Sequence, residues 1–155
     1  MKLRNEKKVI FNINPQTNVR ATQGDRIFFK IPRDKLRPSG LKRLLRLEKY
    51  NSYKISLSAI AKSKRFVPPE QGGHLVFYIP VPKTWKKYKK QEMHLKLHQS
   101  KPDWDNLAKA FFDGLLMEDK HIADVRVTKR WVNNEQGWIE FIFYLPEIPS
   151  ADVLI

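Results

Sequence analysis

The chain is 155 residues long, which is enough for one domain with a buried core. It contains no cysteine, which excludes disulfides and cysteine-based metal sites, and it has no run of about eighteen apolar residues that would cross a membrane. Its formal net charge of +14 favours a nucleic acid as the partner, although ribosomal and membrane-surface proteins are often equally basic.

The first part of the chain predicts two short strands and one long helix. Alternating apolar and polar residues, bounded by prolines, indicate the strands, and apolar residues at helical spacing indicate the helix. The two loops between these elements are polar and basic. The strands are residues 8–14 and 26–31, the helix is residues 41–62, and the loops are residues 15–25 and 33–40.

A short apolar strand follows at residues 75–79, and a basic segment with aromatic residues comes after it. In that segment, residues 83–100, lysines lie on both sides of Trp85 and Tyr88. Cations for phosphates and rings for stacking are the ingredients of a nucleic-acid contact, but the same residues also fit a solvated loop whose rings anchor it to the core. The cations that we expect to contact DNA are Arg20, Arg26, Lys86, Lys87, Lys89, Lys90 and Lys101.

The next stretch, residues 101–127, holds six carboxylates around one central lysine. Periodicity predicts a helix from about residue 105 to 116, and Pro102 and Asp103 precede it in the extended or turn conformation that comes before a helix N-terminus. One face of this helix is charged and the opposite face is apolar. The charged face carries Asp105, Lys109 and Asp113, and the apolar face carries Leu107, Ala110, Phe111 and Gly114.

These carboxylates fit two interpretations. If the helix packs back on the strand that follows it, the acidic residues at its start converge with Glu118 and Asp119 beyond its end, and together they form a cage for a divalent metal with a lysine beside it. In the other interpretation, the acidic residues only favour the positive end of the helix dipole, and Asp105 and Lys109 are an ordinary surface pair.

Two further strands complete the predicted fold, and they are expected to form a hairpin. The resulting order of elements is β, β, α, β, α, β, β, which predicts a single α+β domain. Its sheet is mixed or antiparallel, has about four to five strands and carries two main helices packed on it. The two strands are residues 124–131 and 137–145, the domain is residues 1–147, and residues 148–155 form a flexible tail.

The distribution of charge along the chain favours the metal cage over the interpretation in which the acidic residues only stabilise the helix. Residues 1–100 carry 24 Lys and Arg against 6 Asp and Glu, whereas residues 101–155 carry 6 against 10. A basic body with an acidic spot is what a metal-dependent nuclease requires, because cations gather phosphates and carboxylates hold the metal. A DNA-binding module without catalysis has less reason for such carboxylates, since they repel the phosphodiester when no metal is bound.

The residues KPDWDNLAKAFFDGLLMEDKHIADVRVTK resemble the signature of the RusA family of Holliday junction resolvases, which are common in bacteria and their prophages. The similarity is specific over residues 101–129 and looser upstream, where a strand, a basic loop, a long helix and the strand FYIPVPK follow in the same order. The chain departs from the family pattern in having Glu118 before Asp119, where Asp-Asp is frequent, and in a weaker Pro/Arg-rich segment after the first strand.

The resemblance implies a homodimeric, Mg²⁺-dependent endodeoxyribonuclease of DNA recombination and repair, which cuts four-way junctions symmetrically and accepts Mn²⁺ as a substitute. It implies a cytoplasmic protein whose partner is branched DNA. Carried over to this sequence, the metal ligands are Asp103, Asp105 and Asp119, and the catalytic lysine is Lys109. Asp113, Asp124 and Glu118 have supporting or structural roles.

Two alternatives stay open at this point. The first is a structure-selective or general nuclease that uses the same metal site on other DNA. The second is a non-catalytic DNA-binding protein, such as a prophage remnant or a regulator. The complete set of Asp103, Asp105, Lys109 and Asp119 argues against the second alternative, because a binding module has no need of it.

Overall fold

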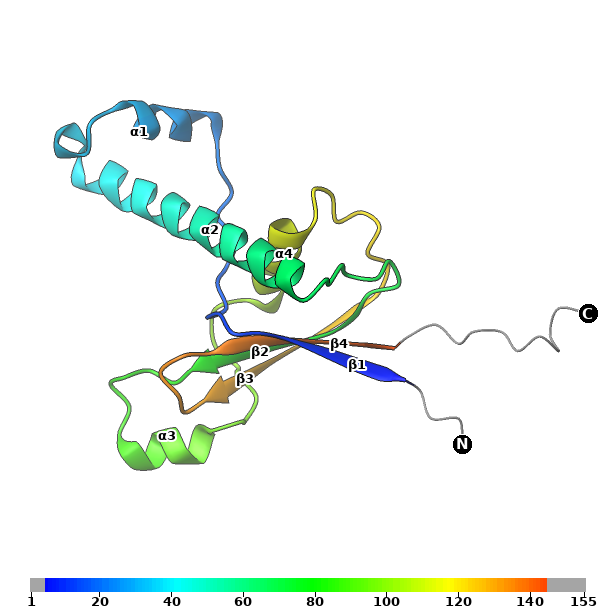
Figure 1. The fold of residues 1–155 in the computed structure, drawn as a ribbon. Helices are drawn as coiled ribbons and strands as arrows, with labels where there is room; N and C mark the ends of the chain where they lie inside the picture. The colour runs from blue at the N-terminus through cyan, green and yellow to red at the C-terminus, as the bar shows by residue number, and fades with distance from the viewer. Residues whose placement is uncertain (1–4, 145–155) are drawn as a thin grey trace, which may run out of the picture.

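The computed structural model describes residues 5–144 and consists of one four-stranded sheet with helices on one face and a projecting helical arm (Figure 1). The predicted end of the domain at residue 147 and the tail at 148–155 lie outside these residues. No helix within residues 5–144 is long and apolar enough to cross a membrane. The elements are β1 (Glu6–Phe11), α1 (Arg26–Lys30), α2 (Pro38–Ser63), β2 (Gly73–Pro80), α3 (Lys87–Met93), α4 (Trp104–Leu115), β3 (Val125–Val132) and β4 (Trp138–Tyr144), with short 3₁₀ turns η1 (Gln23–Asp25) and η2 (Arg33–Lys35).

The sheet is mixed, with the strand order β1-β4-β2-β3. β2 pairs parallel with β3 and antiparallel with β4, and β1 pairs antiparallel with β4. This arrangement confirms the α+β class, and the strand number is at the lower end of the prediction. The predicted hairpin is wrong, because β2 lies between β3 and β4 and the chain crosses over it through residues 133–137.

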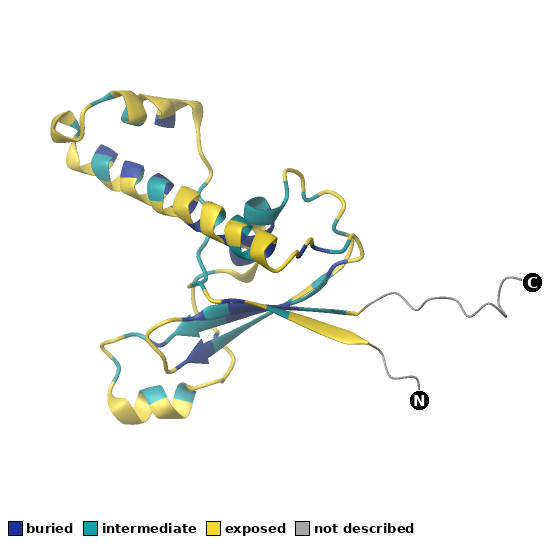
Figure 2. Ribbon diagram, in the orientation of Figure 1, coloured by how far each residue is buried: buried dark blue, intermediate teal, exposed yellow. Residues whose placement is uncertain are grey.

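The core lies between the sheet and the helices α2 and α4, and Figure 2 colours its buried residues dark blue. Aromatic rings fill it. Phe111 of α4 is fully buried, stacks on Phe141 of β4 at 6.1 Å and meets Phe11 of β1 edge-on at 5.2 Å. Leu107 and Ala110 are also fully buried, which confirms the predicted apolar face of the helix. Each buried ring removes roughly 150–250 Å² from water, so this face fixes how α4 sits on the sheet.

The helix α2 is 26 residues long and joins the core only through its second half. It begins with Pro38 in the first turn, three residues before the predicted start, which suits a residue that lacks an N–H. At its other end Arg65 adopts a left-handed φ of 52°, and the N–H of Phe66 donates to the carbonyl of Ala61 at 2.9 Å. This is a Schellman cap, and it turns the chain back so that Phe66 enters the core.

The segment predicted as a second strand, residues 26–31, is instead the helix α1, so that prediction is wrong. It belongs to the arm, which we define as residues 20–49 and which projects away from the sheet (Figures 1 and 2). None of the four strands within residues 5–144 pairs with it there. Phe28 instead packs on Gly40 of α2, where an added Cβ would lie 3.1 Å from the ring. Tertiary contacts within the arm therefore outweigh the strand preference of this segment.

The arm is fastened by a salt bridge between Asp25 and Arg43. The guanidinium of Arg43 donates to both carboxylate oxygens of Asp25, at 3.1 and 3.0 Å, and to the carbonyl of Arg20 at 2.7 Å. Asp25 is buried, and its hydrogen bonds from Arg43 and from the backbone of Thr22 hold the pKa of this carboxyl well below its usual range. The loop before α1 is thereby tied to α2.

Candidate active site

The helix α4 begins where the sequence placed it, within one residue, and its start is held by the sheet. Asp103 is the N-cap residue, with extended backbone at φ −71° and ψ 143°. Lys129 of β3 donates through Nζ to the carbonyls of Ser100 and Pro102, both at 2.7 Å. These two hydrogen bonds fix the loop that enters the helix, and therefore fix the position from which Asp103 and Asp105 project.

The charged face of α4 carries a cluster that includes the loop after the helix. Lys109 Nζ lies 2.7 Å from Oδ2 of Asp119 and 3.3 Å from Oδ1 of Asp113. From α2, the hydroxyl of Tyr50 donates to Oδ2 of Asp113 at 3.2 Å. We call Asp105, Lys109, Asp113 and Asp119 the acidic face. The structure brings Lys109 together with two of the predicted carboxylates, and it adds Tyr50 of α2, which was not among the predicted site residues.

Lys109 and Asp119 each favour the charged form of the other. Hydrogen bonds from Lys109 lower the pKa of Asp119, and the bonds to Asp119 and Asp113 raise the pKa of Lys109. Burial, and then the charge of Asp113, raise the pKa of Tyr50, so its hydroxyl keeps its proton and stays a donor. The side chains of Lys109 and Asp119 are 47% and 38% exposed. A pair this exposed adds no more than about 1 kcal/mol to stability, so a contribution to the stability of the fold does not explain why the pair is present.

The predicted metal ligands do not form one cluster in the structure. Asp103 and Asp105 are exposed, and their carboxylates bind no other side chain within residues 5–144. Asp119 is bound by Lys109. Within that range, no three His, Cys, Asp or Glu residues are grouped closely enough to hold a metal ion. The donor chemistry nevertheless fits Mg²⁺, because exposed carboxylate oxygens are the ligands that this ion takes while keeping several waters.

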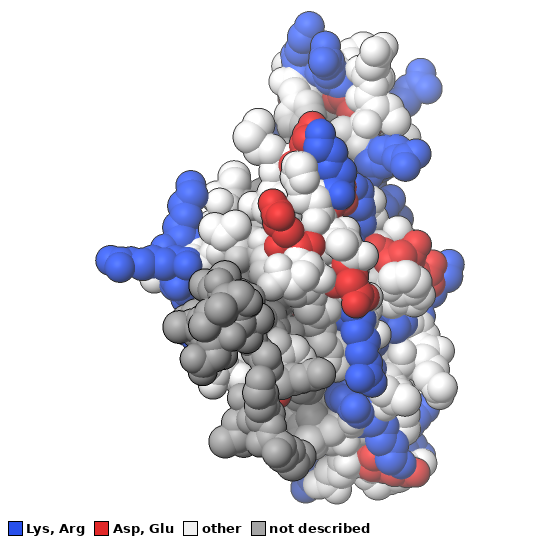
Figure 3. Space-filling view, turned by 90° about the vertical axis from the view of Figure 1, so that its right-hand side faces the viewer, with Lys and Arg blue, Asp and Glu red and all other residues white. Residues whose placement is uncertain are grey.

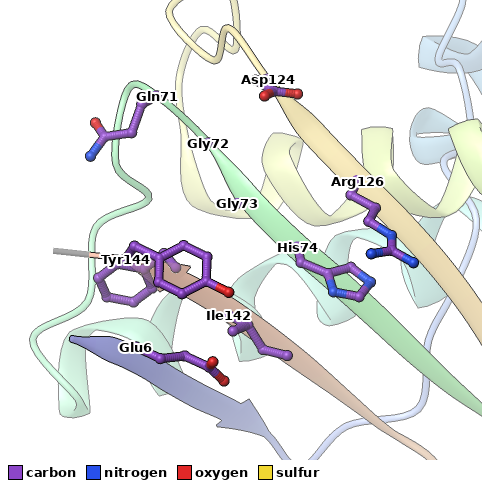
Figure 4. A pocket seen from close by; sticks show the side chains of 10 residues that line it. Glu6, Gln71, Gly72, Gly73, His74, Asp124, Arg126, Ile142 and Tyr144 are labelled. Atoms are coloured by element: carbon purple, nitrogen blue, oxygen red, sulfur yellow. The ribbon is translucent and has the colours of Figure 1, made fainter. Parts of the chain in front are cut away.

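The remaining acidic residues of the stretch lie apart from Lys109. Glu118 pairs with its neighbour Lys120 at 2.7 Å on the exposed loop. Asp124 lines a different pocket, of about 550 Å³, together with Arg126 and His74 (Figure 4). Its carbonyl accepts the N–H of Gly73 at 3.1 Å, so the backbone of Asp124 aligns β2 with β3. This arrangement suits the structural role expected of Asp124. Asp113, by contrast, contacts Lys109 directly.

The match to known families covers most of the chain. The family model described as endodeoxyribonuclease RusA matches residues 30–140, which include the whole acidic face. The chain belongs to the RusA family of endodeoxyribonucleases. No protein with a curated description matches the chain. The match confirms the resemblance seen in residues 101–129, and it begins after Arg20 and Arg26, which therefore lie outside the matched part.

In this RusA-family chain the basic segment 83–90 lies partly in the short helix α3, at the edge of the sheet beyond β3. Its two aromatic residues differ. Trp85 packs on Trp131 of β3 at 4.8 Å, with the ammonium of Lys89 4.2 Å above its ring, whereas Tyr88 is 67% exposed. Trp85 therefore anchors the segment to the sheet, as one of the two interpretations predicts, and the exposed ring of Tyr88 leaves the predicted nucleic-acid contact as a prediction.

One group of acidic side chains lies between two basic regions. Figure 3 shows a group of Asp and Glu side chains in the middle of the view, with Lys and Arg side chains above them, toward the arm, and below them. The predicted DNA contacts Arg20, Arg26, Lys86, Lys87, Lys89 and Lys101 are exposed, and Lys90 is half-buried. A phosphate backbone that crosses this group of carboxylates is therefore bordered by cations on both sides.

Proposed function

We propose that this protein is a metal-dependent endonuclease that cuts four-way DNA junctions, with its chemistry on the acidic face of α4. The observation that carries the proposal is the position of Lys109, whose ammonium lies between Asp113 and Asp119 on the helix that Asp103 and Asp105 begin. Membership of the RusA endodeoxyribonuclease family supports the reaction class, and the basic regions on either side support DNA as the substrate.

We assign Asp103, Asp105 and Asp119 to Mg²⁺, with Mn²⁺ as a substitute. When bound, the ion supplies Lewis-acid activation of the phosphate and of a water molecule. Asp103 and Asp105 would hold the ion through carboxylate oxygens that bind no other side chain of residues 5–144, and Asp119 would bind it in place of Lys109. Lys109 would still contact Asp113, which also accepts a hydrogen bond from Tyr50.

We assign Lys109 to charge stabilisation during hydrolysis of the phosphodiester. The oxygen of water bonds to phosphorus, one P–O bond to the sugar breaks, and the leaving oxygen takes a proton. Negative charge grows on the phosphate oxygens and on the leaving oxygen, and an ammonium fixed nearby lowers the energy of that state. Because its pKa is raised by Asp119 and Asp113, Lys109 is charged at neutral pH and acts as a cation rather than as a base.

The proposal includes a homodimer. A four-way junction has two-fold symmetry, so two equivalent cuts require two equivalent sites, and a single chain offers one acidic face within its described residues. The expected result of light scattering at micromolar concentration is the mass of two chains. A monomer mass in a preparation that makes paired cuts would contradict this part of the proposal.

The proposal also includes a cellular role, which is DNA recombination and repair in the cytoplasm.

Cleavage of three synthetic substrates tests the function. A four-way junction, a flap and a linear duplex of the same sequence are incubated side by side with Mg²⁺, with Mn²⁺ and with EDTA. We expect paired cuts in the junction only, and none in EDTA. Equal cleavage of the duplex would identify a general nuclease, and binding without cleavage of any substrate would identify a non-catalytic DNA-binding protein.

A further inference from the structure

A groove beside the start of α4 has no role in the mechanism above. It has a volume of about 320 Å³ and lies between the middle of α2, the loop after β1 and the loop that enters α4. We propose that this groove binds a phosphate of the DNA backbone that neighbours the phosphate being cut, with Arg46 and Lys49 as its cationic ligands; this rests on the proposed function. The groove is lined by Pro15, Gln16, Thr17, Val19, Arg46, Lys49, Tyr50 and Pro102.

The groove adjoins the acidic face through three connections. Pro102 lines it, and the next residue is Asp103, the N-cap of α4. The N–H of Asn18, in the loop that forms one wall, donates to the carbonyl of Asn106 in the first turn of α4 at 3.3 Å. Tyr50 lines the groove and also donates to Asp113. A strand that crosses the acidic face can therefore place a neighbouring phosphate in the groove.

The cations of the groove are free to bind an anion, unlike others on the same helix. Arg43 is bound by Asp25, and Arg33 of the arm is bound by Glu48. Arg46 and Lys49 form no ion pair or hydrogen bond through their side chains with any residue of the described range 5–144. With Lys42 they follow the spacing i, i+4, i+7, which places all three on one side of α2. The positive surface thus continues from the groove along α2 toward the first turns of that helix.

The other lining residues also suit a phosphate. Gln16 and Thr17 carry an amide and a hydroxyl, which are frequent donors to phosphate oxygens. None of the described lining residues is Asp or Glu. The three other pockets described in the structure each include a carboxylate, namely Asp124 and Glu6, Asp25, or Glu135. Among these four pockets, this groove is therefore the one whose lining charges favour an anion.

The test compares Arg46→Ala, Lys49→Ala and the double variant with a control, Lys62→Ala/Lys64→Ala, which removes two exposed cations at the far end of α2. Junction binding is measured in EDTA over a range of salt concentrations. We expect the log–log salt slope to fall by about 1 for each groove cation that contacts DNA, and to stay unchanged in the control. An unchanged slope in a double variant that keeps the wild-type melting temperature would overturn the proposal.

A second measurement locates the phosphate. Junctions with a single neutral methylphosphonate linkage at each position around the cut are bound to the wild-type protein and to the double variant. We expect the neutral linkage at one flanking position to weaken junction binding by the wild-type protein and to leave binding by the double variant unchanged. Equal sensitivity of both proteins to every linkage would overturn the proposal. Both measurements report DNA binding rather than cleavage. If the wild-type protein binds the junction without cutting it, the proposed nuclease activity is refuted, and the proposal that the groove binds a phosphate is still tested by these measurements.

Discussion

The acidic face of α4 and the basic segment 83–90 differ in how their charges are held. On the acidic face Lys109 lies between two carboxylates, one of which is also bound by Tyr50, so four side chains fix one another. In residues 83–90, Lys86, Lys87 and Lys90 bind no carboxylate of the described chain, and Lys89 lies over Trp85. Catalysis needs charges in fixed positions, whereas phosphate binding needs only exposed charges. Single substitutions should therefore have large effects on cleavage in the first region and small effects on DNA binding in the second.

The largest expected effect is the loss of cleavage without the loss of binding. Asp103→Asn, Asp105→Asn and Asp119→Asn should each abolish cutting, because the ligands of the proposed metal are removed. Junction binding in EDTA should stay equal or become tighter, because each substitution removes a negative charge near the phosphates. Gel-shift and cleavage assays on the same preparations give the answer. If binding and cleavage fall together, the carboxylates support the fold rather than the reaction.

The next effect separates a fixed charge from an ordinary surface pair. Lys109→Ala should lower the single-turnover rate by about 10²–10³, the range for loss of one preorganised electrostatic donor. Its stability should change by less than about 1 kcal/mol, because the pair is half exposed. Mg²⁺ affinity should fall less than in the aspartate variants and can rise, since Lys109 competes for Asp119. Lys109→Arg should rescue the rate only in part, because its reach differs. A near-wild-type rate for Lys109→Ala would remove the lysine from the mechanism.

A smaller and cumulative effect is expected in the basic segment. Replacing Lys86, Lys87, Lys89 and Lys90 by Ala should lower the log–log salt slope of junction binding by about 0.9 for each lysine that contacts a phosphate. The cleavage rate at saturating enzyme should change little. Tyr88→Ala should weaken binding without changing the slope, because stacking releases no counterion. An unchanged slope in the quadruple variant would show that this side of the molecule faces away from DNA.

The smallest effect on the reaction is expected at Asp25, which lies in the arm rather than in either region. Its pKa is lowered in the folded protein, so its bond to Arg43 stabilises the arm above the ordinary carboxyl pKa of about 3.9 and loses this effect as the pH falls below that value. Asp25→Asn should therefore melt earlier at pH 7 and expose residues 20–37 to trypsin. The difference in melting temperature should shrink below about pH 4. A constant difference down to pH 2 would contradict the assignment.

The sequence was sufficient for α4 because local and tertiary preferences agree there. A twelve-residue pattern with Leu107, Ala110 and Phe111 on one face leaves only one face to bury. The predicted first and last residues of the helix each differ from the observed ones by one residue. The other predicted strands and the long helix are also present, with ends shifted by a few residues. The family resemblance rests on this same segment, so the reaction class could be predicted together with the helix.

Two errors arose where the neighbour, rather than the sequence, decides the structure. Residues 26–31 have strand-forming side chains, but they lie on the arm, where they form a helix and the partly buried Phe28 packs on Gly40. The alternation in β3 and β4 gives the faces of each strand and says nothing about which strand lies beside it. β2 occupies the position between them. Pairing across a sheet is a non-local choice that a period of two does not encode.

The contacts between α2 and α4 were missed for a similar reason. Tyr50 and Asp113 are 63 residues apart, and nothing in either local pattern predicts their hydrogen bond. The spacing of Lys42, Arg46 and Lys49 is visible in the sequence, but only the fold shows that their helix face meets the loop before Asp103. Charge composition therefore predicted the partner, and the crossing of two helices was needed to propose where a phosphate binds.

The partial support of α2 turns the helix into a lever. Its second half is fixed by the core, so Tyr50 lies near the fulcrum, and the twelve residues back to Pro38, a length of about 18 Å, pack on the rest of the arm instead of the core cluster. A rotation of about 10° at the fulcrum would carry the tip through about 3 Å. Arg46 and Lys49, close to the fulcrum, would hardly move, while the cations at the tip would sweep an arc. Under the proposed function, one stiff element would in this way keep its register at the cut and still follow junction arms that leave it at different angles.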